Sequence, residues 1–92
     1  MEIEGSEKRA HLVFLYECLG TTLFVYSILL TSNPVSISFS LFASIMLFGS
    51  ITGGHFNPAV TLGVYIKEAK WSKNLRWLLI VIFSQLCGAM FA

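Results

Sequence analysis

Between Ala10 and Ile66 the chain carries a single formal charge, the carboxylate of Glu17. An ordinary soluble domain has about 25% charged residues, whereas 12% of these 92 residues are charged. Apart from Glu17, the charges lie in two short stretches, residues 2–9 and 67–76. Long uncharged segments between charged ends are typical of proteins that span a membrane. The charge distribution therefore predicts a membrane protein rather than a soluble core.

Three apolar runs are candidates for membrane helices. Residues 12–30 form a run about long enough to cross the ~30 Å hydrocarbon layer as a helix. A cleaved signal peptide is the alternative, but its apolar region should be about 7–15 residues and should end in a small-residue cleavage site. Residues 35–51 form a second span, whose serines and alanine favour close helix packing in lipid. Residues 77–92 are shorter, and we expect them to be a truncated third span.

Lysine and arginine residues predict which side of the membrane each end occupies. Four of them lie in residues 67–76, two more precede residue 10, and the turn at 31–36 has none. We therefore expect residues 1–10 to be a cytoplasmic tail and 67–76 to be a cytoplasmic loop. Two crossings bring the chain back to the cytoplasmic side, so the next segment must enter and leave the membrane by one face. Residues 52–66 are thus predicted to be re-entrant.

Asn57 and Pro58 predict that a short helix starts in the middle of this segment. Asn is a favoured N-cap, and Pro suits the first helical position. Ten helical residues, 57–66, span about 15 Å, which is half of the hydrocarbon layer. Non-helical backbone at that depth, here residues 52–56, is tolerated only where it is buried in protein or lines a water-filled cavity. Its carbonyls, the free NH2 of the capping Asn57 and the positive helix end would together admit neutral hydrogen-bonding solutes.

Glu17 is predicted to face this segment. A carboxylate inside a membrane span is expensive and should face the protein interior with a partner. Counted inward from the cytoplasmic end, Glu17 lies about 8–9 Å deep, at the level that residues 52–56 must traverse. We expect it to accept hydrogen bonds from N–H groups of that loop. The alternative is a carboxylate that faces lipid or extends toward the interface.

The sequence Thr-Gly-Gly-His-Phe-Asn-Pro-Ala-Val-Thr at 52–61 resembles the first signature of the major intrinsic protein family, the aquaporins and aquaglyceroporins. That signature is usually Ser-Gly-x-His-x-Asn-Pro-Ala-Val-Thr. Residues 17–24 resemble the family's first helix, and residues 84–89 resemble its third. The resemblance implies an all-α membrane fold in which residues 11–92 are the first of two inverted repeats. This aquaporin-like first repeat has two transmembrane helices, a re-entrant half-helix carrying Asn-Pro-Ala and a truncated third transmembrane helix.

The resemblance also implies roles for individual residues. Asn57 is similar to the first of two pore asparagines that donate hydrogen bonds to the passing solute. Pro58 and Ala59 resemble the contacts that join the tips of the two half-helices. Glu17 matches a buried glutamate that braces the loop, and Gln85 is expected to contact the same loop. The pore-lining carbonyls are implied to be those of Gly53, Gly54, His55 and Phe56.

Two questions about the site stay open in the sequence. The family takes a selectivity-filter aromatic from its second helix, about twenty residues before the Asn-Pro pair, where this chain has Ile37. An aliphatic residue argues against a strict water-only filter, but a gap of two would restore an aromatic, Phe39. His55 is either a structural residue with satisfied contacts or a residue whose side chain touches the solute.

These features predict a passive transmembrane channel for water or small neutral solutes such as glycerol, present here as its N-terminal half. The resemblance implies a multi-pass protein in a lipid bilayer that forms a homotetramer when full length. The alternative is a non-conducting structural or regulatory membrane protein, or a truncated product, of the same fold.

Other classes of function find little support in the residues. No nucleophile–base pair indicates an enzyme, and no basic run with interleaved aromatics indicates a nucleic-acid partner. No cofactor or metal is expected, because neither histidine has metal-ligand spacing to a cysteine. Cys18 and Cys87 are expected to be small buried residues rather than a disulfide.

Overall fold

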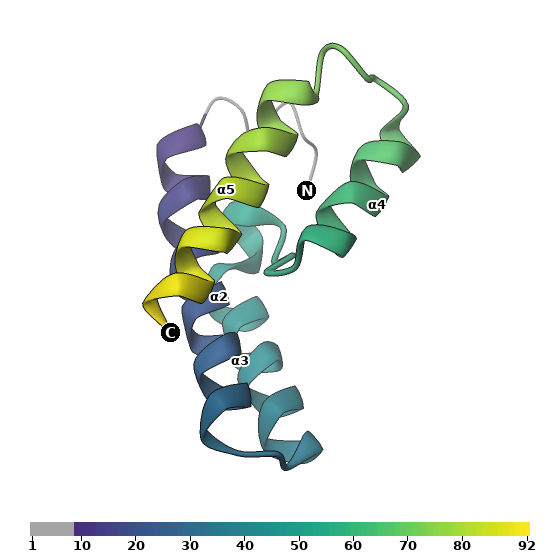
Figure 1. Ribbon diagram of the computed structural model, residues 1–92. Helices are drawn as coiled ribbons and strands as arrows, with labels where there is room; N and C mark the ends of the chain where they lie inside the picture. The colour runs from purple at the N-terminus through teal and green to yellow at the C-terminus, as the bar shows by residue number, and fades with distance from the viewer. Residues whose placement is uncertain (1–8) are drawn as a thin grey trace.

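The computed structural model describes residues 9–92, and within this range the chain is built from four helices without β-strands (Figure 1). They are α2 (Ala10–Leu30), α3 (Pro34–Thr52), α4 (Pro58–Glu68) and α5 (Leu75–Phe91). The predicted all-α fold class is confirmed. Most of the predicted N-terminal tail, residues 1–8, lies outside the described residues.

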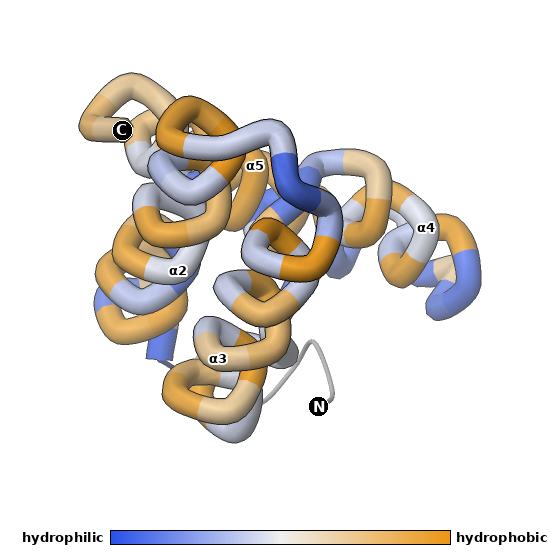
Figure 2. The backbone as a smooth tube through the Cα atoms, turned by 90° about the horizontal axis from the view of Figure 1, so that it is seen from below, coloured by the Kyte–Doolittle hydropathy of each residue, from blue (hydrophilic) through white to orange (hydrophobic). Residues whose placement is uncertain are grey.

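Helices α2 and α3 form a long antiparallel hairpin (Figure 1). Their 21 and 19 residues correspond to about 32 and 28 Å, and both are long and apolar enough to cross a membrane. The turn between them ends where the Oδ1 atom of Asn33 accepts a hydrogen bond from Val35 N at 2.9 Å, with Pro34 at the first helical position. The backbone tube in Figure 2 shows hydrophobic residues along most of both helices.

Helix α5 packs closely against α2. A β-carbon on Gly88 would lie 2.5 Å from the carbonyl oxygen of Cys18, so only glycine permits this crossing. The Thr22 hydroxyl contacts both helices, with the Cys18 carbonyl at 2.7 Å and the Gly88 carbonyl at 3.0 Å. Cys18 and Cys87 are both free and half-buried. The apolar core nearby consists of Val13, Trp77, Leu78 and Val81, with Val64, Tyr65 and Ile82 packed against it.

Helix α4 is about half as long as the two hairpin helices. Its 11 residues span about 16 Å. It begins near the middle of the molecule, runs toward the end where α2 and α5 begin, and packs against α5 (Figure 1). The chain between α3 and α5 therefore stays in one half of the molecule.

The connection between α4 and α5 is shorter than the loop expected at 67–76, because both helices extend into that range. Helix α4 continues to Glu68 and ends at Ala69, which has a left-handed φ of 56° and donates its N–H to Tyr65 O. Helix α5 starts at Leu75, after Asn74. The non-helical connection is residues 69–74.

Candidate functional site

Residues 53–57 connect α3 to α4 as a short non-helical segment. Gly53 ends α3 with its N–H donated to Gly49 O at 2.8 Å, and its φ of 93° favours glycine because L side chains rarely adopt it. Gly54 also has a positive φ, 69°, and donates its N–H to the Thr52 hydroxyl at 3.0 Å. Two successive glycines thus let the chain leave α3 and reverse within a few residues.

Phe56 adopts a left-handed φ of 53° although it carries a side chain. Non-glycine residues pay a conformational cost there unless the surroundings hold them. Its N–H donates to Glu17 Oε1 at 2.9 Å, and its ring is buried. The ring fills the space beside Gly20. A β-carbon on Gly20 would lie only 2.1 Å from the Phe56 Cε1 atom. Contacts from α2 therefore hold this turn in its conformation.

Glu17 is fully buried and joins three parts of the chain. Its Oε1 atom accepts the Phe56 N–H at 2.9 Å and the Gln85 Nε2–H at 2.9 Å. Gln85 Nε2 also donates to the Thr61 hydroxyl at 2.8 Å. One buried hydrogen-bond network thus connects α2, α4, α5 and the segment between α3 and α4.

Thr61 is the second junction of this network. Its hydroxyl donates to Asn57 O at 3.2 Å, accepts from Gln85 and lies 3.1 Å from Nδ1 of His55. A hydroxyl has one proton to donate, so Nδ1 is the donor in the contact between His55 and Thr61. The His55 ring also packs edge-on against Trp77, with 5.7 Å between ring centroids. Both contacts fix the orientation of the half-buried His55 ring.

The start of α4 is open to the surroundings. Asn57 Oδ1 accepts the Ala59 N–H at 2.8 Å, with Pro58 at the first helical position. The oxygen is committed to this cap, so the NH2 of Asn57 is the group that can donate outward. Asn57, Pro58, Ala59 and Val60 are all exposed. The site thus combines an amide donor, non-helical backbone and the positive end of a helix.

Ile37 does not lie at this site. It is half-buried in the first turn of α3, about 22 Å along the helix axis from Thr52. Phe39, the nearby aromatic, is exposed and packs against Phe42 with ring centroids 6.3 Å apart.

Sequence reasoning did not single out Thr61 or Trp77 as members of the site. Thr61 follows the capping Asn57 by four residues, which puts both on one face of a helix, so this spacing was a usable signal. Nothing in the sequence indicates that Trp77 reaches His55. Among residues 9–92, no three His, Cys, Asp or Glu side chains lie together as a metal site.

Comparison with known proteins relates the chain to one family. Residues 5–92 match the sequence model of the family described as major intrinsic protein. An aquaglyceroporin of Toxoplasma gondii is 42% identical over 55 residues, which cover 60% of this chain and 20% of that protein. A probable glycerol uptake facilitator protein of Thermotoga maritima is 47% identical over 47 residues, or 50% of this chain and 18% of that protein.

A longer match, to aquaporin PIP1-2 of Zea mays, is 30% identical over 91 residues, covering 79% of this chain and 32% of that protein. The chain thus spans between about a fifth and a third of the length of these curated relatives. No solved structure matches the chain significantly.

Proposed function

Because the chain belongs to the major intrinsic protein family, we propose that it builds one half of a passive membrane channel for water and small neutral solutes such as glycerol. Relatives named as an aquaglyceroporin and a probable glycerol uptake facilitator support the inclusion of glycerol. Relatives named as aquaporins support water. The other half of the pore is then supplied by a second repeat outside these 92 residues.

One observation carries this proposal: the hydrogen bond from the Phe56 N–H to the buried carboxylate of Glu17. It holds non-helical backbone against the α2/α5 pair. Non-helical backbone at membrane depth requires either burial in protein or a water-filled cavity. With the Phe56 N–H committed inward, the carbonyls of residues 53–56 and the NH2 of Asn57 are the groups that would exchange hydrogen bonds with a passing solute.

The short helix α4 supports selectivity for neutral solutes. Its N-terminus carries about half a positive charge, and its length of about 16 Å would bring that end near the midplane of a ~30 Å hydrocarbon layer. A positive helix end at the centre of a pore repels cations and disfavours a chain of protonated water. Solutes that only exchange hydrogen bonds are not opposed in this way.

The proposed arrangement in the membrane follows from the same elements. Helices α2 and α3 cross the bilayer, the segment 53–68 enters and leaves by the cytoplasmic face, and α5 begins the next crossing. The N-terminus and the 69–74 connection are then cytoplasmic, and the full-length protein is a homotetramer. Ile37 is the candidate filter position, and its distance of about 22 Å from Thr52 along α3 fits a filter that lies toward the other side of the membrane.

The test is solute flux through the full-length protein in liposomes, measured by stopped-flow light scattering with osmotic and glycerol gradients. We expect the flux of water, of glycerol or of both through the wild-type protein to exceed the flux in empty vesicles. Asn57→Ala should lower the flux about fivefold, as expected for the loss of one hydrogen bond of about 1 kcal/mol.

Asn33→Ala is the matched control, because Asn33 caps a Pro-started helix in the same way but lies at the far end of the hairpin. It should keep wild-type flux per folded protein. Wild-type flux equal to that of empty vesicles would overturn the channel and favour the non-conducting structural or regulatory alternative.

A further inference from the structure

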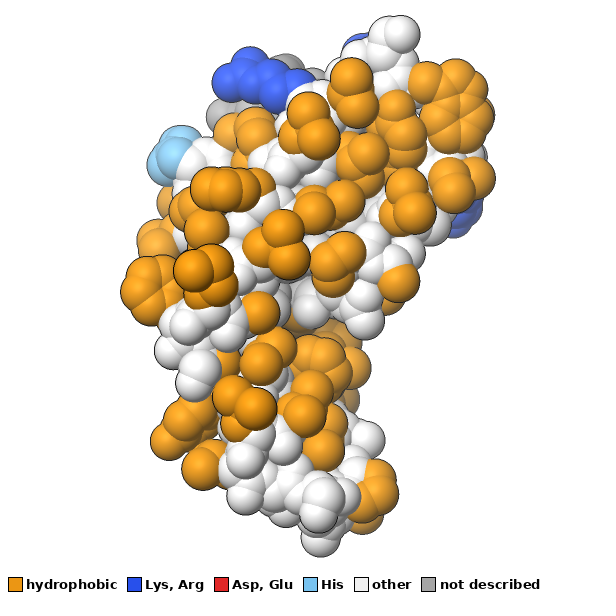
Figure 3. Space-filling model, viewed as in Figure 1, with side chains coloured by type: hydrophobic (Ala, Val, Ile, Leu, Met, Phe, Trp, Pro, Cys, Tyr) orange, Lys and Arg blue, Asp and Glu red, His pale blue; other side chains and the backbone are white. Residues whose placement is uncertain are grey.

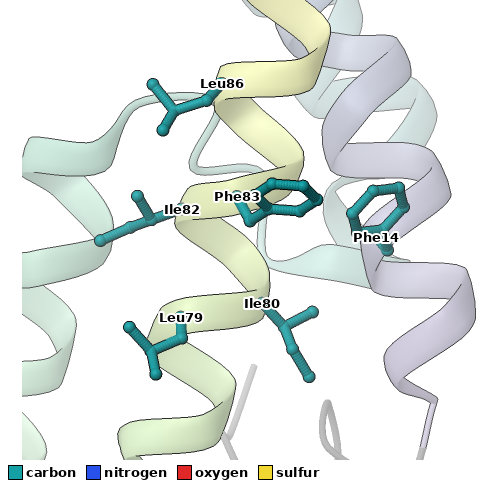
Figure 4. A pocket seen from close by; sticks show the side chains of 6 residues that line it. All are labelled: Phe14, Leu79, Ile80, Ile82, Phe83 and Leu86. Carbon is teal, nitrogen blue, oxygen red and sulfur yellow. The ribbon is translucent and has the colours of Figure 1, made fainter.

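The outward face of α2 and α5 carries an apolar groove that the proposed pore does not use. It has a volume of about 560 Å³. Figure 4 shows the Phe14 and Phe83 rings pointing toward each other from the two helices, with centroids 5.9 Å apart. Its lining is Phe14, Leu79, Ile80, Ile82, Phe83 and Leu86.

Basic side chains lie at one end of this groove. Arg76 is exposed and precedes Leu79 and Ile80 by three and four residues on α5, which puts it on the same helix face one turn away. His11, also exposed, precedes Phe14 by three residues on α2. Figure 3 shows basic side chains and a histidine at the end of the molecule where α2 and α5 begin.

Acidic side chains do not balance this end within the described residues. Residues 9–92 contain two of them, Glu17 and Glu68. Glu17 is buried in the hydrogen-bond network and Glu68 ends α4. Within the described residues, the groove is thus apolar along its length, with the exposed Arg76 at one end.

The distance from Arg76 to the far end of the groove matches one leaflet of a bilayer. Arg76 and Leu86 are ten residues apart on a continuous helix, which corresponds to about 15 Å. That distance is half of the ~30 Å hydrocarbon layer. A cation at the membrane surface can bind the headgroup of a phospholipid. An apolar groove that extends from it into the leaflet can hold the acyl chain.

We propose that the groove binds an acyl chain of an anionic phospholipid, with the headgroup phosphate at Arg76 and the α2 start near His11. This site rests on the part of the proposed function that puts α2 and α5 across a bilayer, and it is independent of conduction. A second copy that meets this face by two-fold symmetry fits less well. A two-fold contact through this face would bring two sets of basic side chains together at the same end, whereas an anionic headgroup neutralises them.

A second groove supplies an internal comparison. Pro34, Val35, Ser38, Phe39 and Phe42 line a pocket of similar volume, about 560 Å³, at the start of α3. The chain has no lysine or arginine between Ala10 and Ile66, so the described part of the chain offers no basic side chain of its own near that pocket. Lipid that binds by apolar contact alone should use both grooves, and lipid that needs the cation should use only the first.

The test is native mass spectrometry of the full-length protein with dioleoyl phosphatidylglycerol or dioleoyl phosphatidylcholine. We expect the wild type to retain phosphatidylglycerol about fivefold better, the preference given by one basic residue at an anionic headgroup. Arg76→Gln should bring the ratio close to one, while Lys67→Gln, which removes the same charge at the end of α4, should leave it unchanged. Leu86→Ala should lower retention of phosphatidylglycerol, and Phe39→Ala, in the second groove, should not.

Equal retention of the two lipids by the wild type would overturn the proposed lipid site. So would an equal loss of preference in Arg76→Gln and Lys67→Gln, because that indicates diffuse surface charge. Dissociation of oligomers by Leu86→Ala without a change in bound lipid would assign the face to a second copy instead. Flux measured on the same preparations separates the two proposals: lost preference with intact flux rejects only the lipid site, and intact preference without flux rejects only the channel.

Discussion

At the scale of single residues, the most consequential side chain is the carboxylate of Glu17. It is fully buried, and two donors from distant parts of the chain, Phe56 N and Gln85 Nε2, converge on its Oε1 atom. A buried donor that loses its acceptor costs about 1–3 kcal/mol. The carboxylate therefore stabilises the turn at Phe56 and the approach of α5 at the same time.

Replacing Glu17 tests this role. Glu17→Leu leaves the Phe56 N–H and one N–H of Gln85 without an acceptor and should lower the free energy of unfolding by roughly 2–5 kcal/mol. Glu17→Gln keeps an acceptor oxygen in the same position and should cost clearly less. Thermal or denaturant unfolding of the full-length protein in detergent measures both variants. Equal stability of Glu17→Leu and the wild type would contradict the bracing role.

At the scale of elements, two glycines determine how closely α2 can be approached. The Phe56 ring occupies the space beside Gly20, and the backbone of α2 at Cys18 lies against Gly88 of α5. One glycine thus makes room for the segment that precedes α4, and the other makes room for a helix. Gly63 of α4 differs from both, because a β-carbon there would meet no atom within 4 Å.

Gly20→Ala and Gly63→Ala form a matched pair. The added methyl group at Gly20 would force the Phe56 ring to move, and such overpacking typically costs about 1–3 kcal/mol. The same change at Gly63 should be neutral or stabilising by up to about 1 kcal/mol, because alanine favours helix over glycine. The melting temperature of each full-length variant measures the difference. Phe56→Leu should partly rescue Gly20→Ala, and a lack of rescue would show that the ring is not the obstacle.

At the scale of the whole molecule, the described part of the chain leaves the proposed pore open on one side. Helix α4 packs mainly on α5, and residues 57–60 at its start are exposed. An exposed helix start cannot enclose a pathway, because a solute beside Asn57 would meet this chain on one side only. The proposed channel therefore needs a second half-helix facing the first.

A direct consequence concerns residues 1–92 expressed alone. They should not conduct water or glycerol, since the proposed pore would be open on one side. The measurement is osmotic swelling of liposomes that contain only these residues, with the full-length protein as the positive control. Swelling faster than empty vesicles would show that the chain, by itself or as an assembly of copies, encloses a complete pore.

Local sequence features were sufficient to predict the helices and where they start. The long uncharged runs predict the two long helices, and the Asn33-Pro34 and Asn57-Pro58 pairs predict where α3 and α4 begin, because capping depends on neighbouring residues alone. The expected hydrogen bond between Glu17 and the segment before α4 also follows from depth along a helix. The end of α4 was less predictable, because the chain continues as a helix into the charged residues up to Glu68.

Only the tertiary structure decided which side chains share the buried network. The bonds that join Glu17 to Phe56 and to Gln85 link residues 39 and 68 positions apart. Whether such residues meet depends on the rotation and spacing of packed helices, which the close contacts at Gly20 and Gly88 set. Thr61 became a junction, and His55 acquired its orientation, for the same reason. The sequence by itself therefore determined the helices and their starts through local energetics, and the packing of α2 against α5 determined how the site is assembled.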